Sequence, residues 1–190
     1  AYQNIYTQAT SGAPILNDSL QRRGGGSWDE GTSQDGSACF FQNGSYHVTA
    51  PKTSFFTPCY ENAFSFQNFA FQVDIALVKG DDAGIVFRGN PNSGKAYLFV
   101  ISGDGAYSLY VYTGFNADQS STLYSGSTSD MQSGKNQLTV IAKGNTFYFY
   151  LNQQFINSLA DGTHTSGQIA LVADAPQNAT EAVFNNAKAW

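Results

Sequence analysis

Four residues of the sequence belong to the types that bind sugars: Arg88, Tyr97, Tyr110 and Tyr112. A tyrosine ring offers an apolar face to sugar C–H groups and keeps a hydroxyl as a polar handle. A guanidinium holds two acceptors in a fixed fork, so a uronic or sulfated sugar would suit Arg88 best. We therefore expect these residues to bind a glycan.

The four residues can share a surface only if the alternation of side chains is taken in the correct register. If Phe87 and Val111 point to the core, then Arg88 and the tyrosines at 110 and 112 point outward, and Tyr97 can join them. A shift of one residue would invert both sets. An alternative stays open, in which an acid such as Asp74 pins Arg88 and the tyrosines merely cover the sheet.

Trp28 is a further candidate for ligand binding. It follows three consecutive glycines, Gly24 to Gly26, which do not form a regular element. The indole is either a platform for a ligand on a loop or a plug over the edge of the core.

Aspartates in turn-like segments are candidate calcium ligands, because calcium prefers several carboxylate and carbonyl oxygens. These are Asp18, Asp81, Asp82 and Asp104. Asp is also a favoured turn residue, so this dispersed set points only weakly to calcium. No other metal or cofactor is indicated.

Cys39 and Cys59 are the only cysteines of the chain. An even pair with a short loop between its members predicts one disulfide. The alternative is two free thiols in the core of a cytosolic protein.

Period-two alternation dominates the chain from residue 64 onward and predicts a relay of β-strands. Gly and Asn clusters separate the runs at hairpin spacing. No helix beyond single turns is expected. The predicted strands are 64–78, 83–89, 95–102, 106–113, 121–125, 136–143, 146–152, 154–160, 167–174 and 180–190, together with a short strand around Tyr46 and Val48.

This pattern predicts an all-β antiparallel sandwich that forms one domain over residues 14–190. Residues 1–13 are polar and are expected to be an arm or a linker. The arm alternates weakly over residues 2–10, which is compatible with a strand that pairs with the sheet edge of another copy; disorder is the alternative.

Composition limits the partners and the compartment. The formal net charge is −5 with nine Lys and Arg residues, and no basic patch is visible, so a nucleic-acid partner is not expected. No run of eighteen apolar residues occurs, so insertion into a membrane is not expected. The acceptor sequons at Asn17, Asn43 and Asn178 and the few charged residues favour an extracellular or cell-surface protein.

Several segments in a fixed order carry a family resemblance over residues 13–190. The set resembles the concanavalin A-like jelly-roll domains, in the branch that includes laminin-G-like modules and keto-disaccharide hydrolase-like domains. It is most similar to extracytoplasmic modules of bacterial surface proteins. The resemblance implies a jelly-roll sandwich, but this fold hosts lectins, enzymes and spacers. The segments are 14–20, 44–48, 68–73, 84–89, 149–152 and 180–190.

The polysaccharide-cleaving enzymes of this fold resemble one another in a Glu-x-Asp-x-x-Glu strand, which this chain lacks. Its three glutamates are Glu30, Glu61 and Glu181, which lie far apart in the sequence, and no strand carries two carboxylates on one face. A pair assembled from loops, such as Asp104 with Asp161, is the remaining route to glycoside hydrolysis.

The sequence is therefore compatible with three functions. The leading one is a non-catalytic extracellular module that binds a glycan or another cell-surface ligand. The alternatives are a structural subunit that assembles through residues 2–10 and an enzyme acting on a glycoside.

Overall fold

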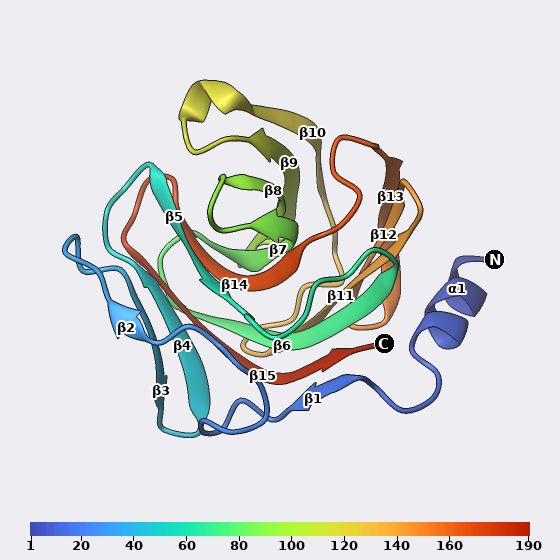
Figure 1. The fold of residues 1–190 in the computed structure, drawn as a ribbon, viewed down its shortest axis with the longest axis horizontal. Helices are drawn as coiled ribbons and strands as arrows, with labels where there is room; N and C mark the ends of the chain where they lie inside the picture. The colour runs from blue at the N-terminus through green and yellow to red at the C-terminus, as the bar shows by residue number, and fades with distance from the viewer.

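We describe the protein from a computed structural model that covers all of residues 1–190. Two antiparallel sheets face one another and form a single β-sandwich domain, which confirms the predicted fold class (Figure 1). Two short helices accompany them, α1 (Tyr2–Ala9) and the 3-10 turn η1 (Ala117–Gln119). Neither is long and apolar enough to cross a membrane.

The strands divide between a nine-stranded and a six-stranded sheet. The first contains β1 (Leu16–Asp18), β2 (Gly31–Thr32), β3 (Ala38–Gln42), β4 (Ser45–Ala50), β6 (Phe69–Lys79), β11 (Asn136–Lys143), β12 (Thr146–Leu151), β13 (Gln154–Ala160) and β15 (Thr180–Ala189). The second contains β5 (Phe55–Tyr60), β7 (Asp82–Asn90), β8 (Lys95–Ser102), β9 (Ala106–Thr113), β10 (Ser120–Ser127) and β14 (Gln168–Ala175).

The order of strands in space differs from their order in the chain. The nine-stranded sheet runs β13-β12-β11-β6-β15-β4-β3-β2, and β1 pairs with the C-terminal half of β15. The six-stranded sheet runs β10-β9-β8-β7-β14-β5. All ten strands predicted from residue 64 onward form. The largest difference is that β6 begins at Phe69, because Phe66 instead makes an isolated bridge with Gly167.

The core lies between the two sheets and is rich in aromatic rings. Phe87 stacks on Tyr97 with ring centroids 5.1 Å apart and meets Phe147 edge-on at 4.9 Å. Phe99 stacks on Phe149 at 4.5 Å. These contacts join β7 and β8 to β12, so the inward residues of the predicted alternation hold the two layers together.

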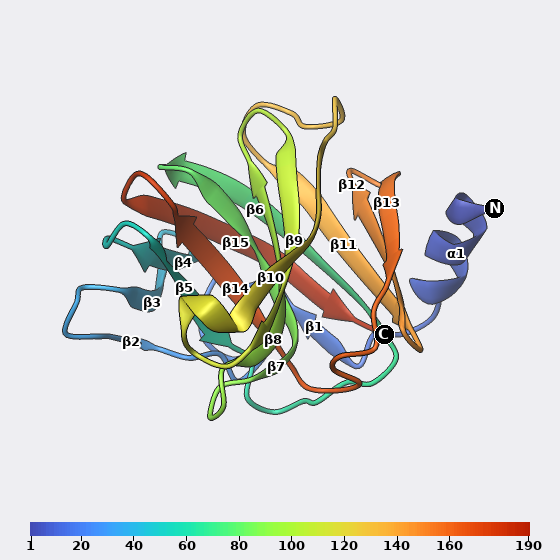
Figure 2. The same ribbon diagram turned by 90° about the horizontal axis from the view of Figure 1, so that it is seen from above.

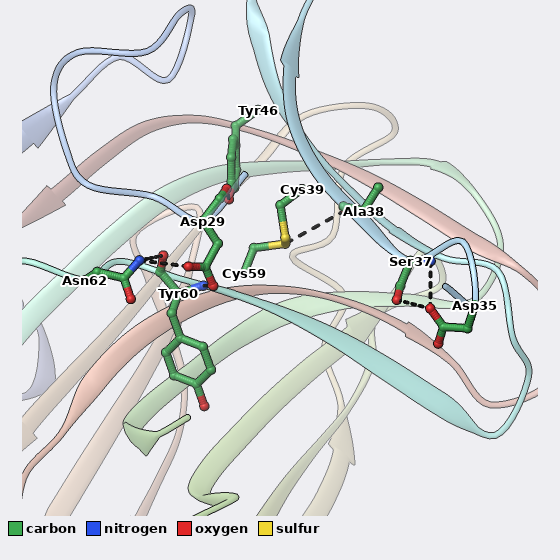
Figure 3. The surroundings of a disulfide bond; sticks show 9 residues. All are labelled: Asp29, Asp35, Ser37, Ala38, Cys39, Tyr46, Cys59, Tyr60 and Asn62. Atoms are coloured by element: carbon green, nitrogen blue, oxygen red, sulfur yellow. Dashed lines mark hydrogen bonds between the residues drawn. A yellow bond between two sulfur atoms is a disulfide. The ribbon is translucent and has the colours of Figure 1, made fainter. Parts of the chain in front are cut away.

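The disulfide between Cys39 and Cys59 connects the two sheets, as Figure 3 shows. Cys39 lies on β3 and Cys59 on β5, with their Cα atoms 5.9 Å apart. The predicted disulfide is thus formed. Beside it, Asp29 accepts hydrogen bonds from the backbone N–H of Tyr60 at 2.9 Å and from the amide of Asn62 at 2.8 Å. These bonds fix the loop that precedes β2 against the end of β5.

The N-terminal segment does not form the strand or free linker that its composition suggests. Residues 2–9 form α1, which lies against the outside of the nine-stranded sheet beside β12 and β13 (Figures 1 and 2). The Tyr6 hydroxyl donates to Gln72 at 2.7 Å, and the Tyr2 ring stacks on Phe155 at 3.8 Å. Assembly through residues 2–10 would first require this helix to leave its own sheet.

Candidate ligand-binding face

The six-stranded sheet has an apolar face that points away from the core. Its floor consists of small and branched apolar side chains from three strands, β7, β8 and β14, and aromatic rings overlie them. The floor residues are Val86, Ala96, Leu98, Val100, Ala170 and Val172, and the overlying rings are Phe56, Tyr60, Tyr110 and Tyr112. An apolar outward face of this kind needs either a cover or a ligand.

This face is concave. Phe56 lies on β5 and Tyr112 on β9, which are four strand positions apart in the sheet. A flat sheet would separate these strands by about 19 Å, because neighbouring strands lie about 4.8 Å apart. The two rings nevertheless meet edge-on with centroids 5.4 Å apart. The sheet therefore curls strongly, as Figure 1 shows from β5 round to β9, and we call its inner side the concave face.

Two hollows flank the contact between Phe56 and Tyr112, and both rings line each hollow. The first, the apolar hollow, has a volume of about 120 Å³ and no charged side chain in its lining. It is lined by Phe56, Pro58, Tyr60, Val86, Pro91, Gly94, Ala96, Tyr112, Gly114 and Phe115. The second, the acidic hollow, has a volume of about 310 Å³ and is lined by Ser54, Phe55, Phe56, Leu98, Tyr110, Tyr112, Asp174 and Pro176.

The acidic hollow borders a pair of carboxylates from adjacent strands. Asp174 on β14 is the direct cross-strand partner of Asp82 on β7, so both side chains stand on the concave face. Burial, reinforced by the charge of Asp82, raises the pKa of the Asp174 carboxyl to about 7. Burial and the charges of Asp81 and Asp104 raise the pKa of the Asp82 carboxyl to about 6. The pair therefore titrates near neutral pH.

The structure places Tyr110 and Tyr112 as the alternation predicts. Leu109 and Val111 are buried in the core between the sheets, and the two tyrosines are partly exposed on the concave face. Tyr110 lines the acidic hollow, whereas Tyr112 separates the two hollows. Their role in binding a ligand stays a prediction.

Arg88 does not lie on this face, so its predicted orientation is wrong. A β-bulge between Phe87 and Asn90 turns its side chain inward, and only 2% of the residue is exposed. Its guanidinium donates to three backbone carbonyls, those of Gln67 at 2.7 Å, Gly144 at 2.6 Å and His164 at 2.9 Å. The alternative pairing with Asp74 is wrong as well, because Asp74 contacts Asn186 and Lys135.

Tyr97 and Trp28 are also buried rather than presented to a ligand. The Tyr97 ring lies in the core on Phe87, and its hydroxyl donates to Asp161 at 2.5 Å. The Trp28 indole N–H donates to Asp18 at 3.1 Å, and its ring is 5.7 Å from that of Tyr46. Trp28 thus plugs the edge of the core, and both residues lose the predicted binding role.

Among the four candidate calcium ligands, Asp81 and Asp104 lie near enough to Asp82 to add to the effect of burial and raise the pKa of its carboxyl, whereas Asp18 contacts Trp28. Asp18 accepts from Leu20 and Trp28, Asp81 accepts from the backbone at residues 177 and 178, and Asp104 accepts from Ser102. The structure gathers no group of three or more His, Cys, Asp or Glu side chains that could hold a metal ion. Asp18, Asp81 and Asp104 thus serve as hydrogen-bond acceptors, and calcium binding stays a prediction.

The sequence suggested the wrong carboxylate pair. Asp161 is bonded to Tyr97 near the start of β8, whereas Asp104 follows the end of that strand, so the two lie apart. The pair that does form, Asp82 with Asp174, depends on the pairing of β7 with β14, which are far apart in the chain. Phe56 was also missed, although Phe56, Pro58 and Tyr60 alternate along one face of β5.

The sandwich is a concanavalin A-like jelly roll, and solved structures share it. The chain is similar to the carbohydrate-binding module CBM66 from Bacillus subtilis, with a TM-score of 0.63, 18% identity and coverage of 86% of this chain and 91% of that chain. It is also similar to a protein of unknown function with a galectin-like fold from Bacillus subtilis, with a TM-score of 0.71, 14% identity and coverage of 95% and 96%.

A third similar structure is the beta-glucanase of Bacillus licheniformis, with a TM-score of 0.64, 8% identity and coverage of 95% of this chain and 99% of that chain. Identities this low establish the fold alone. No protein-family model matches the sequence, and a search of curated proteins finds no match.

Proposed function

We propose that this protein is a non-catalytic module that binds a neutral oligosaccharide along the concave face. The contact of Phe56 with Tyr112, with a hollow on each side, carries the proposal. A sugar ring can lie against these aromatic faces, and the two hollows can take its substituents or the edge of an adjoining ring. The similar structures include a carbohydrate-binding module and a beta-glucanase, which supports a glycan as the ligand.

The charges on this face favour a neutral ligand. The predicted preference for a uronic or sulfated sugar depended on Arg88, which is buried. Asp82 and Asp174 would instead repel an anion and accept hydrogen bonds from sugar hydroxyls. The intrachain disulfide between Cys39 and Cys59 suits an oxidising compartment, so we propose that the module functions outside the cytosol.

A glycan array followed by calorimetric titration tests the proposal. We expect binding with a Kd on the order of 0.1 mM, equivalent to about 5 kcal/mol. Tyr112→Ala should weaken it at least tenfold, roughly the value of one aromatic contact. Tyr124→Ala is the matched control, because Tyr124 is an exposed ring on the same sheet that stacks on the inward Tyr107. Equal loss in both variants would contradict the proposal.

The Asp82–Asp174 pair favours a second candidate, an enzyme that hydrolyses a glycoside. Two carboxyls with pKa values of about 6 and 7 suit acid and base roles. We rank it second because no other side chain donates a hydrogen bond to orient either carboxyl. Release of reducing ends from a β-glucan, abolished in Asp174→Asn, would favour the enzyme over the binding module.

A further inference from the structure

The apolar hollow differs from the rest of the concave face in its shape and in its rim. The β7–β8 turn contributes Pro91 and Gly94, the β9–β10 loop contributes Phe115, and Ala96 forms part of the floor. Phe115 is 70% exposed at this rim, the largest exposure among the large hydrophobic side chains. An aromatic ring held in solvent beside an apolar hollow is typical of a surface that covers a ligand.

The rim is held in place by contacts between the two loops. Gly94 has φ of +72°, and a Cβ there would lie 2.7 Å from the backbone of Gly114 and Phe115, so only glycine permits this approach. The Gln119 side chain accepts from the backbone N–H of Asn116 at 3.2 Å and closes a capping box around η1. The hollow is therefore preformed, which reduces the ordering that binding requires.

Size and chemistry limit what the hollow can take. An apolar cavity of 150 Å³ accommodates benzene, so about 120 Å³ accommodates a group of four or five heavy atoms. A sugar hydroxymethyl group would leave its hydroxyl poorly paired against this lining, at a cost of about 1–3 kcal/mol. The donors of the lining side chains are the phenols of Tyr60 and Tyr112, which suit one carbonyl oxygen.

We propose that the apolar hollow is a specificity pocket for an acetyl group carried by the bound sugar. The inference rests on the proposed glycan-binding function and adds the class of glycan. The acetyl methyl lies against Ala96 and Val86, the carbonyl accepts from a phenol, and the sugar ring lies against Phe56 and Tyr112. The pocket recognises the acetyl group whether an amide or an ester links it to the sugar.

A glycan array printed with acetylated glycans and their deacetylated counterparts tests this inference. We expect acetylated glycans to bind at least about tenfold more tightly, which is the discrimination that one small apolar group gives in a fitted pocket. Mild alkali removes O-acetyl esters and leaves N-acetyl amides, so treated arrays identify the linkage. Equal binding of both forms would overturn the acetyl inference and leave the proposed function standing, whereas no binding to any glycan would overturn both.

Variants locate the discrimination in the hollow. Ala96→Leu fills the hollow and should remove the preference for acetylated over deacetylated glycans. Ala106→Leu is the matched control, because Ala106 lies at the start of the same sheet's β9 and does not line the hollow. If Ala96→Leu does not fold, as circular dichroism would show, Phe115→Ala is used, which should reduce the preference at least threefold. If the folded variant, Ala96→Leu or Phe115→Ala, still prefers acetylated glycans as strongly as the parent does, the inference is overturned.

Discussion

Arg88 connects three loops at one end of the sandwich through a single side chain. The carbonyls that it binds precede β6, follow β11 and follow β13, and its guanidinium also lies 5.1 Å from the centre of the Phe147 ring. A lysine would supply a point charge in place of this planar fork. Arg88 is therefore a structural residue, although its type and spacing suggested a ligand site.

Arg88→Ala should lower the free energy of unfolding by at least about 3 kcal/mol, because three backbone carbonyls lose charge-assisted hydrogen bonds to a buried guanidinium. Urea denaturation measures the loss. Arg22→Ala is the control, since Arg22 is exposed, and it should change stability by less than about 0.5 kcal/mol. Similar values for the two variants would contradict the structural role of Arg88.

Asp174 makes the protein less stable as the pH rises toward neutrality. Its pKa is about 7 in the folded protein against an ordinary value of 3.8, so the folded state retains a proton that the unfolded chain has released. Stability should therefore fall between about pH 4 and pH 7, and Asp174→Asn should flatten this fall. At pH 7.5 the Asp174→Asn variant should have a free energy of unfolding at least about 1 kcal/mol higher than the parent, because one pKa unit corresponds to roughly 1.4 kcal/mol.

Thermal unfolding of both proteins between pH 4.5 and 7.5 measures the effect. Asp35→Asn is the control of opposite sign, because hydrogen bonds from Ser37 lower the pKa of the Asp35 carboxyl and its ionised form is favoured by folding. That variant should be no more stable than the parent at pH 7.5. A pH profile for Asp174→Asn that parallels the parent's would show that the carboxyl is ionised throughout.

At the scale of elements, the sequence predicted strands well and their irregularities poorly. Alternation located β9 and the inward side of β7 up to Phe87, because a side-chain period of two is a local property. It failed at Arg88, where the bulge adds a residue that no local pattern marks. It also missed the cross-strand pair of Asp82 and Asp174, because strand order is decided by the fold as a whole.

The helix α1 was missed because its signal is weak. Eight residues are too few for a stable isolated helix, and the segment contains no Pro or Gly to separate helix from strand. Packing on the nine-stranded sheet supplies the stability: Tyr6 is 8% exposed and covers Ala70, Ile141 and Tyr150. Tertiary contact thus decides the structure of this segment.

Tyr6→Ala should lower the free energy of unfolding by about 2 kcal/mol, the contribution of one buried aromatic side chain. Thr7→Ala is the control, since Thr7 is exposed on the same helix, and it should have little effect. Deletion of residues 1–13 should expose Ile141 and Tyr150 and promote self-association, which light scattering would detect. A truncated protein as monomeric and as stable as the parent would contradict the covering role of α1.

At the scale of the whole molecule, the disulfide is the one covalent cross-link between the layers in addition to the main chain. It joins β3, the neighbour of the edge strand β2 in the nine-stranded sheet, to β5 at the edge of the six-stranded sheet, across 20 residues of chain. Closure of a loop of this length stabilises the fold by about 3 kcal/mol in the chain-entropy account. Because β5 also supplies Phe56, the same bond holds one wall of the concave face.

Replacement of both cysteines by alanine should therefore have two effects. The free energy of unfolding should fall by about 3 kcal/mol, and glycan affinity should weaken as β5 loosens against β14. Thiol titration of the denatured, unreduced parent should find no free sulfhydryl, and urea denaturation with and without reductant should reproduce the difference in stability. Two titratable thiols would contradict the disulfide. Unchanged affinity together with reduced stability would show that pairing with β14 alone positions Phe56. The disulfide would then stabilise the contact between the two sheets without affecting the concave face.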